Sequence, residues 1–435
     1  MFKEYTKKGR DYLEQKKYGL ALESFERALG CCQTSEDKFC IYLELGVAYR
    51  EKGEYDLAME NFVRAKEFNI KNALIFVEIG RVYQYQKKLD QAIREFKKAE
   101  DNGYVCGEIY MDLGLSCYHQ TDYDSAIAYL SRALSMGVIE NIEVYFYLSR
   151  AYREVGKYDE SVKILAQANE TPFAKEVFFR NKIINEMEIS QRKTMLNSKP
   201  IGLWVNLTTR CNLRCIMCEV WKTQWDIPKT AVKEIAGYFP YLEELFWQGG
   251  EVFLSEYFEE LFDLALTYPH LKQNINTNGI LINEKWAKKL AHKNVSLAYA
   301  IDGVTPGIYE QIRKGAKFQD LLKSIEVMKR YKKIYNANAS YTDKMMTIMS
   351  FIVMKSNYQE LERILDFAKE HEFDLLQVNP VEGVVDLENI FLHNDQEALG
   401  YVHAIMPEIL KQAEDCGITL DVRVPFKDSN SVIAC

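Results

Sequence analysis

The stretch LWVNLTTRCNLRCIMCEVWK, residues 203–222, joins an apolar, strand-like run to three cysteines that crowd into eight positions. These are Cys211, Cys215 and Cys218. Such a cluster needs a chemical reason, because exposed thiols oxidise and buried ones can be replaced by other small apolar residues. In a long chain, clustered thiols indicate metal or redox chemistry rather than a disulfide framework.

Downstream of this stretch, strand-like runs alternate with amphipathic helical ones. Together with the first run there are six, at residues 203–207, 242–248, 273–277, 295–301, 346–354 and 374–379. Strands that are each followed by a helix predict right-handed crossovers and a parallel sheet, either a curved partial barrel or a doubly wound sheet. We expect a partial (β/α)6 barrel over residues 200–390. In both folds ligands gather at the carboxyl ends of the strands, which is where the cysteines fall.

Upstream, residues 1–170 repeat themselves every 34 to 37 residues. Four copies have a Gly that is followed twelve positions later by Ala, and a fifth copy keeps the frame with Ser149. The glycines are Gly9, Gly46, Gly80 and Gly114. This pattern resembles the tetratricopeptide repeat, which implies an α-solenoid whose small residues let paired helices approach closely. Residues 171–199 are expected to form a capping helix and a linker.

The repeat frame places three arginines, Arg10, Arg81 and Arg150, at the same inward position of copies one, three and five. A planar guanidinium suits carboxylates, so these residues could hold an extended peptide with acidic groups. The alternative is that they decorate a solvated face. In either case we expect the solenoid to bind a peptide or a protein.

Composition argues against two classes of partner. The 435-residue chain has a formal net charge of −8, so it lacks the basic field that holds a nucleic-acid backbone. Its start has no signal-type apolar stretch, and no run of roughly 18 residues is apolar and uncharged. We therefore expect a cytoplasmic protein that binds neither nucleic acid nor membrane.

Three interpretations of the cysteine triple compete. A structural zinc site closes with four ligands, and the only other cysteines in this half of the chain are Cys416 and Cys435. Three thiolates without an evident fourth suit a cubane iron–sulfur cluster, in which one iron stays open for chemistry. The third interpretation is that the cysteines only fill space in the core.

The spacing CxxxCxxC in CNLRCIMC resembles that of the radical S-adenosylmethionine enzymes, in which the motif follows the first strand. The resemblance covers roughly residues 201–420. It implies a 4Fe-4S cluster on Cys211, Cys215 and Cys218, with S-adenosylmethionine chelating the open iron. One electron, from a donor such as flavodoxin or ferredoxin, would cleave S-adenosylmethionine to a 5′-deoxyadenosyl radical that abstracts hydrogen from the substrate.

Further motifs similar to those of the family fall at the ends of later strands. FWQGGE, NTNG and AIDG close strands two to four, and YEQIRKG supplies an arginine. The resemblance implies S-adenosylmethionine contacts at Gly249, Gly250, Glu251, Asn276, Thr277, Asn278, Asp302, Arg313 and Ser350. Met217, Val252 and Ala300 depart from the usual family residues, which weakens individual contacts but leaves the cysteines intact. No residue is assigned a catalytic role.

The last segment, residues 391–435, is expected to contain a helix and a strand. GITLDVRVPFKDSNSVIAC resembles the passage that leads into the auxiliary-cluster (SPASM-like) domain of many family members, with Cys435 as its first cysteine. The chain would then be a fragment or a natural short form. With only Cys416 and Cys435 available, we predict no second iron–sulfur cluster.

Together, the barrel and the repeats favour a radical S-adenosylmethionine enzyme that abstracts hydrogen from a peptide or protein recruited by the repeat domain. The same chemistry on a small metabolite or sugar is the alternative. A third hypothesis is a non-catalytic repeat adaptor with a degenerate barrel. Intact thiols in ligand spacing argue against the adaptor.

Overall fold

The computed structural model describes residues 1–435 apart from 70–71, 338, 382–387, 417 and 426–435. The chain forms two compact units, Met1–Lys199 with Ala337–Thr342, and Pro200–Asn336 with Asp343–Cys435. Cys435, the expected first cysteine of an auxiliary domain, lies outside the described residues. Among the helices of the described part, none is long and apolar enough to cross a membrane.

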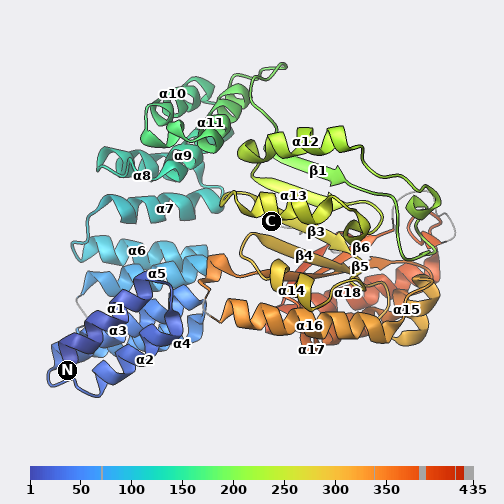
Figure 1. Cartoon of the computed structure of the whole chain (residues 1–435). Helices are drawn as coiled ribbons and strands as arrows, with labels where there is room; N and C mark the ends of the chain where they lie inside the picture. The colour runs from blue at the N-terminus through green and yellow to red at the C-terminus, as the bar shows by residue number, and fades with distance from the viewer. Residues whose placement is uncertain (70–71, 338, 382–387, 417, 426–435) are drawn as a thin grey trace. The chain divides into compact units, whose positions relative to one another are not determined.

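The first unit is a stack of helix pairs (Figure 1). The first helix of each pair contacts its own partner and also the first helix of the next pair. This is the tetratricopeptide solenoid that the sequence predicts. Its elements are α1 (Phe2–Glu14), α2 (Tyr18–Leu29), α3 (Ser35–Lys52), α4 (Tyr55–Phe68), α5 (Ala73–Tyr85), α6 (Leu89–Asp101), α7 (Gly107–His119), α8 (Tyr123–Ser135), α9 (Ile142–Glu154), α10 (Tyr158–Asn169), η1 (Pro172–Lys175) and α11 (Val177–Ser190).

Small residues set the spacing within each pair. A Cβ atom added to Gly9 would lie 2.5 Å from the ring of Phe25, and the glycines of the next three copies face Phe or Leu in the same way. In the fifth copy the small residue is Ser149, whose hydroxyl lies 2.8 Å from that of Ser161. The glycine period therefore reflects a close approach of helices rather than a need for unusual backbone angles.

The inward arginines have carboxylate partners within the solenoid. Arg10 pairs with Glu44 of the next first helix at 2.6 Å, and Arg81 pairs with Asp112 at 2.9 Å. Arg150 pairs with Glu186 of α11. These ion pairs tie successive first helices together. Each of the three guanidinium groups therefore already has a carboxylate partner, and Arg10 is also more than half exposed, as expected for a solvated face.

The second unit is built on one parallel sheet whose strands follow each other in chain order. That order distinguishes a partial barrel from a doubly wound sheet, in which the strand order reverses. The strands are β1 (Gly202–Asn206), β2 (Glu244–Gln248), β3 (Lys272–Thr277), β4 (Val295–Ala300), β5 (Met346–Val353), β6 (Leu375–Pro380) and β7 (Thr419–Val422). The seventh strand extends the six that we predicted: β7 pairs in parallel with β6.

Helices connect these strands and cover one face of the sheet. The α-helices are α12 (Lys229–Tyr238), α13 (Phe258–Leu266), α14 (Glu284–Leu290), α15 (Pro306–Ile312), α16 (Phe318–Asn336), α17 (Leu361–Glu370) and α18 (Gln396–Cys416). Short 3₁₀ turns are η2 (Val220–Lys222), η3 (Phe239–Tyr241), η4 (Val252–Leu254), η5 (Tyr341–Asp343) and η6 (Tyr358–Glu360).

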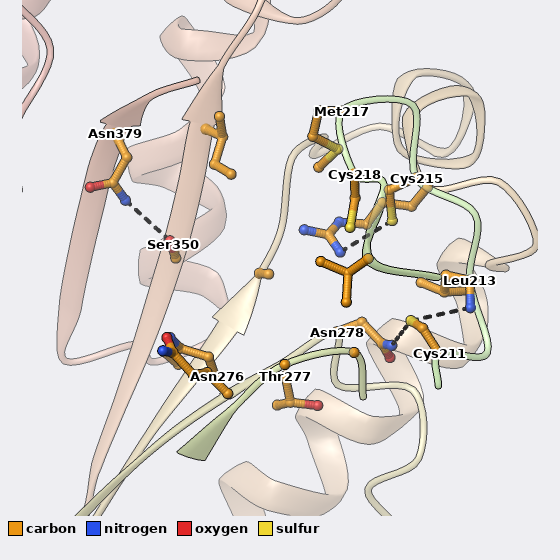
Figure 2. A pocket seen from close by; sticks show the side chains of 18 of the residues that line it. Cys211, Leu213, Cys215, Met217, Cys218, Asn276, Thr277, Asn278, Ser350 and Asn379 are labelled. Carbon is orange, nitrogen blue, oxygen red and sulfur yellow. Dashed lines mark hydrogen bonds between the residues drawn. The ribbon is translucent and has the colours of Figure 1, made fainter. Parts of the chain in front are cut away.

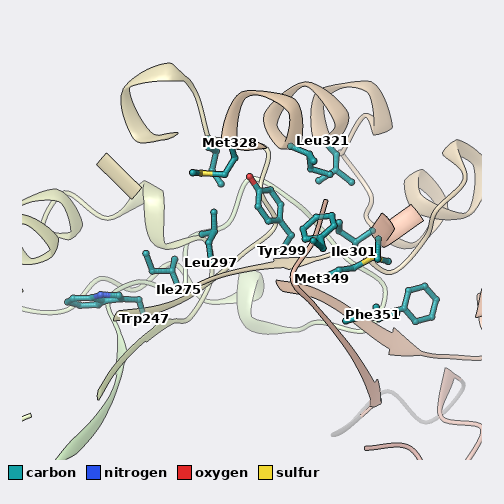
Figure 3. Close-up of a cluster of buried hydrophobic side chains, with 14 of the residues drawn as sticks. Trp247, Ile275, Leu297, Tyr299, Ile301, Leu321, Met328, Met349 and Phe351 are labelled. Carbon is teal, nitrogen blue, oxygen red and sulfur yellow. The ribbon is translucent and has the colours of Figure 1, made fainter. Parts of the chain in front are cut away.

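Side-chain alternation along the strands separates the core from the site. Figure 3 shows Ile275, Leu297 and Tyr299 directed from the sheet toward α16, which carries Leu321 and Met328. These side chains belong to one large buried cluster. Because successive residues of a strand point to opposite faces, the neighbours of these core residues face the other side, where the candidate site lies.

Candidate active site

A cavity of about 910 Å³ lies at the carboxyl ends of the strands. Its wall includes all three cysteines of the triple, the two glycines after β2, the end of β3 and residues from β5 and β6. Figure 2 shows the cysteine loop on one side of the cavity, with Ser350 and Asn379 on the other. The cavity therefore lies at the edge of the sheet where parallel β/α folds bind their ligands.

The three cysteines share this cavity but make different contacts. The Sγ of Cys211 accepts from the backbone N–H of Leu213 at 3.4 Å, whereas the Sγ of Cys215 lies 3.8 Å from Nη1 of Arg313. Burial raises the pKa of the Cys215 thiol to about 11, and the Arg313 guanidinium opposes this shift. Burial also raises the pKa of the Cys211 thiol.

Backbone bonds fix the start and the middle of the cysteine loop. Thr208 and Arg210 accept from the N–H groups of Gly250 and Glu251, both at 2.8 Å. Further along, the N–H of Arg214 donates to the carbonyl of Lys314 at 2.9 Å. The loop is therefore held between the turn after β2 and the turn after α15.

The glycine turn needs the absence of side chains. Gly249 has a φ of +128°, and a Cβ there would lie 2.5 Å from the carbonyl oxygen of Thr208. A Cβ on Gly250 would overlap the carbonyl of Arg210. Both glycines line the cavity, and the N–H of Gly250 is already bonded to the carbonyl of Thr208.

Glu251 follows the glycines but is fully buried and supports the site from behind. Its carboxylate accepts from the hydroxyl of Thr277 at 2.9 Å and from the N–H of Asn278 at 3.0 Å. Burial raises the pKa of Glu251 to about 7, against these two hydrogen bonds. Glu251 thus joins the turn after β2 to the end of β3.

Asp302 and Arg313 form a buried ion pair of 2.6 Å. Asp302 also accepts from the N–H of Ile352 at 3.2 Å, so the pair connects the end of β4 to β5. Arg313 reaches the cavity wall, and its Nε has no hydrogen-bond partner among the described residues. The guanidinium therefore has one unused donor, Nε, which is itself buried, while Nη2 holds Asp302.

The remaining predicted residues, Asn276, Thr277, Asn278 and Ser350, all line the cavity. Asn278 donates from Nδ2 to the side-chain oxygen of Asn212 in the cysteine loop at 2.8 Å. The hydroxyl of Ser350 accepts from Asn379 Nδ2 at 3.2 Å. Of the residues predicted to contact S-adenosylmethionine, only Glu251 and Asp302 do not line the cavity.

Five further polar residues that line the cavity were not predicted from the sequence: Asn206, Gln248, Gln377, Asn379 and Arg423. Arg423 follows β7 and is held by Asp421 at 2.8 Å. Alternation along the strands could have found most of them, because each occupies the face opposite the core. Arg423 could not be found this way, since β7 was not recognised as part of the sheet.

Comparison with known proteins separates the two units. The sequence model of the Radical SAM superfamily matches residues 205–373, and tetratricopeptide repeat models match residues 41–69 and 77–137. The chain carries a radical S-adenosylmethionine domain after tetratricopeptide repeats. The cofactors of this superfamily are a 4Fe-4S cluster and S-adenosylmethionine.

Curated relatives match the barrel only in part. A cysteine-type anaerobic sulfatase-maturating enzyme of Clostridium novyi is 26% identical over 195 residues, which is 40% of this chain and 49% of that enzyme. A tungsten-containing aldehyde ferredoxin oxidoreductase cofactor-modifying protein of Pyrococcus furiosus is 25% identical over 186 residues, 41% of this chain and 50% of that protein. The chain spans about half the length of these relatives.

Solved structures resemble each unit at low similarity. The native anSMEcpe structure with bound AdoMet has 19% identity and a TM-score of 0.42, and covers 52% of this chain and 64% of that one. MamA has 20% identity and a TM-score of 0.33, and covers 36% of this chain and 82% of that protein.

The residues at the cavity fit these cofactors chemically. Three thiols in CxxxCxxC spacing are a soft donor set for iron, and the glycine turn leaves room that a side chain would fill. Among the described residues, no three His, Cys, Asp or Glu side chains converge on one ion position. A cubane does not need such convergence, because each cysteine binds a different iron.

Proposed function

We propose that this protein is a radical S-adenosylmethionine enzyme that acts on a peptide or protein. The observation that carries the proposal is the shared cavity, whose wall combines the three thiols, the glycine turn and the polar end of β3. In this proposal Cys211, Cys215 and Cys218 hold the cluster. When bound, the cluster and S-adenosylmethionine supply a 5′-deoxyadenosyl radical.

The protein's own residues position the cofactor. The backbone of Gly249 and Gly250 receives the methionine part of S-adenosylmethionine, and Asn276 and Asn278 offer amide groups nearby. Arg313 lines the cavity and is held by Asp302, and in this proposal its guanidinium pairs with the methionine carboxylate. Glu251 and Asp302 keep these groups in place from behind. Ser350 on β5 is a further proposed contact of S-adenosylmethionine, and the wall from β6 to β7, with Asn379, then faces the substrate.

The cluster ligands can be tested by anaerobic reconstitution with iron and sulfide. We expect the Cys215→Ala variant to lose most of its bound iron and to form no 5′-deoxyadenosine from S-adenosylmethionine under reducing conditions. Cys31→Ala is the matched control, because Cys31 is a half-buried free thiol of the solenoid. A full iron complement in the Cys215 variant would remove the ligand assignment.

The peptide part of the proposal rests on the solenoid. Between α7 and α9, aromatic rings stand where ion pairs join other first helices: Tyr118 lies 5.0 Å from Tyr147 and 5.7 Å from His119, measured between ring centres. Amphipathic rings of this kind suit peptide side chains. We expect 5′-deoxyadenosine formation to rise with a protease-sensitive fraction of cell extract, and Tyr118→Ala to reduce that stimulation.

A small polar metabolite is the second candidate, favoured by the polar wall at Gln377, Asn379 and Arg423. The same experiment separates the two. Stimulation that survives protease and passes through a dialysis membrane would support the metabolite, and stimulation that protease destroys would support the peptide.

A further inference from the structure

Four exposed basic residues lie on the cysteine loop, directly after it, and on the turn after α15 that is bonded to it. We define the basic edge as Arg214, Lys222, Lys314 and Lys317. Arg214 is exposed next to Cys215, and its guanidinium lies 4.9 Å from the ring centre of Trp221, the neighbour of Lys222. The backbone of Arg214 donates to the carbonyl of Lys314, so residues far apart in the sequence meet here.

The edge is held in a defined shape rather than left loose. Nη1 of Arg214 donates to the carbonyls of Cys211 and Leu213, both at 2.9 Å. Gly315, next to Lys314, has a φ of +95° and packs against the loop at Asn212 and Leu213. Arg214 thus belongs to the cysteine loop itself, and Lys314 belongs to the turn after α15 that is hydrogen-bonded to this loop.

The charges of the edge leave a local positive excess. Lys222 pairs with Glu219, and Lys317 pairs with Glu310 at 3.0 Å, so these two pairs are neutral. Within the part of the chain that the structure describes, no carboxylate pairs with Arg214 or Lys314, and both side chains are exposed. The whole chain has a net charge of −8, so the basic edge is a positively charged site on an acidic protein.

The position of the basic edge relative to the cavity indicates its role. Cys215 lines the cavity, whereas Arg214 and Lys314 lie outside its wall. In the proposed function, S-adenosylmethionine and substrate fill the cavity, so an electron has to arrive from the outer side of the loop. Electron transfer falls steeply with distance, and Arg214 of the basic edge is an exposed residue directly next to Cys215.

We propose that the basic edge is the docking surface for a small acidic electron-transfer protein. The inference rests on the proposed function. One electron passes from the donor's reduced flavin to the cluster, so the donor is oxidised by one electron and the cluster is reduced by one. Opposite charge steers the acidic donor to this edge, while the acidic remainder of the chain repels it elsewhere. Redox encounters need only a small interface of this kind.

The test uses the full-length, reconstituted protein and flavodoxin hydroquinone as the probe. Stopped-flow bleaching of the cluster gives the second-order rate with flavodoxin and, separately, the rate with dithionite. For Lys314→Glu we expect a fall of at least about tenfold in the flavodoxin rate at low salt, with the dithionite rate unchanged. The wild-type flavodoxin rate should also fall as salt rises, because screening weakens steering.

Lys317→Glu and Lys323→Glu form a matched pair of variants. Lys317 and Lys323 are similarly exposed, 70% and 75%, and each pairs with a carboxylate, at 3.0 and 3.1 Å. Only Lys317 belongs to the basic edge. We expect the flavodoxin rate to fall in Lys317→Glu and to stay unchanged in Lys323→Glu.

Three outcomes decide the proposal. Equal flavodoxin rates in wild type, Lys314→Glu and Lys323→Glu would overturn the docking surface and leave the proposed function standing. No bleaching by dithionite in wild type would overturn the proposed function itself. Lys314→Glu could also disturb the loop and lower the rate of cluster reduction by dithionite. In that case, the affinity of the cluster-free chain for flavodoxin is measured instead. An affinity that Lys317→Glu weakens and Lys323→Glu does not supports the basic edge, and equal affinities reject it.

Discussion

At the scale of single residues, the turn after β2 has almost no steric freedom. Gly250 faces the carbonyl of Arg210, which also accepts from the N–H of Glu251. We predict that Gly250→Ala lowers the free energy of unfolding by about 1 to 3 kcal/mol, the usual cost of overpacking. The measurement is urea unfolding followed by tryptophan fluorescence.

The control for this prediction is Gly237→Ala. Gly237 lies in α12, and a Cβ there would meet no heavy atom within 4 Å. Alanine favours a helix over glycine by about 1 kcal/mol, so this variant should be as stable as wild type or more stable. Equal losses in the two variants would show that the glycine turn is not sterically special.

The titration of Glu251 makes the free energy of unfolding depend on pH in a known direction. Its pKa is about 7 in the folded state and ordinarily 4.5, because burial penalises the carboxylate. Such a group binds its proton more tightly when folded, so its contribution to stability falls as pH rises from 4.5 to 7. Relative to Glu251→Gln, wild type should lose about 2 kcal/mol between pH 5 and pH 8.

This comparison is made by urea unfolding of both proteins at the two pH values. The variant carries all other titrating groups unchanged, so their effects cancel in the difference. A difference that stays constant with pH would mean that Glu251 is ionised in the folded protein throughout this range.

At the scale of elements, ion pairs join the first helices of successive repeats. Glu78 on α5 holds Arg50 of α3 at 2.9 Å and Arg81 at 3.1 Å, and both Glu78 and Arg50 are buried. We predict that Glu78→Ala costs about 3 kcal/mol, because it leaves the Arg50 charge buried with a weaker partner. The measurement is the urea midpoint of the far-ultraviolet circular dichroism.

Glu60→Ala is the control on the same solenoid. Glu60 pairs with Arg64 on α4, but both side chains are about half exposed. Removal of a solvent-exposed pair of this kind costs on the order of 0.5 kcal/mol. Similar losses for Glu60→Ala and Glu78→Ala would mean that burial does not set the strength of these pairs.

The elements also show what a sequence can predict here. The repeats and the first six strands could be predicted because their patterns are local: a glycine period for close helices and apolar runs for buried strands. The addition of β7 to the sheet could not, since it depends on pairing with β6 across the whole of α18. For the same reason the ion pairs of Arg10, Arg81 and Arg150 were missed, because their carboxylates lie about one repeat away.

The candidate site divides in the same way. The cysteine triple and the motifs at strand ends predicted most of the cavity wall. Sequence did not separate lining residues from supporting ones: Glu251 and Asp302 belong to the same motifs as their neighbours, and only their complete burial shows that they stand behind the wall.

At the scale of the whole molecule, each unit has hydrophobic cores of its own. The solenoid is built from several small clusters between neighbouring helices, whereas the barrel has one large cluster around its sheet and one small cluster beside it. A chain of small clusters, each in contact only with its neighbours, loses cooperativity more readily than a single core. We therefore predict two unfolding transitions rather than one.

The sequence provides a clean way to measure this. All five tryptophans lie in the second unit: Trp204, Trp221, Trp225, Trp247 and Trp286. Tryptophan fluorescence thus reports the barrel, while the helical circular dichroism signal comes largely from the solenoid. Glu78→Ala should shift the circular dichroism midpoint and leave the fluorescence midpoint in place, and Gly250→Ala should do the reverse. If both probes moved together in both variants, the two units would have to unfold as one cooperative block.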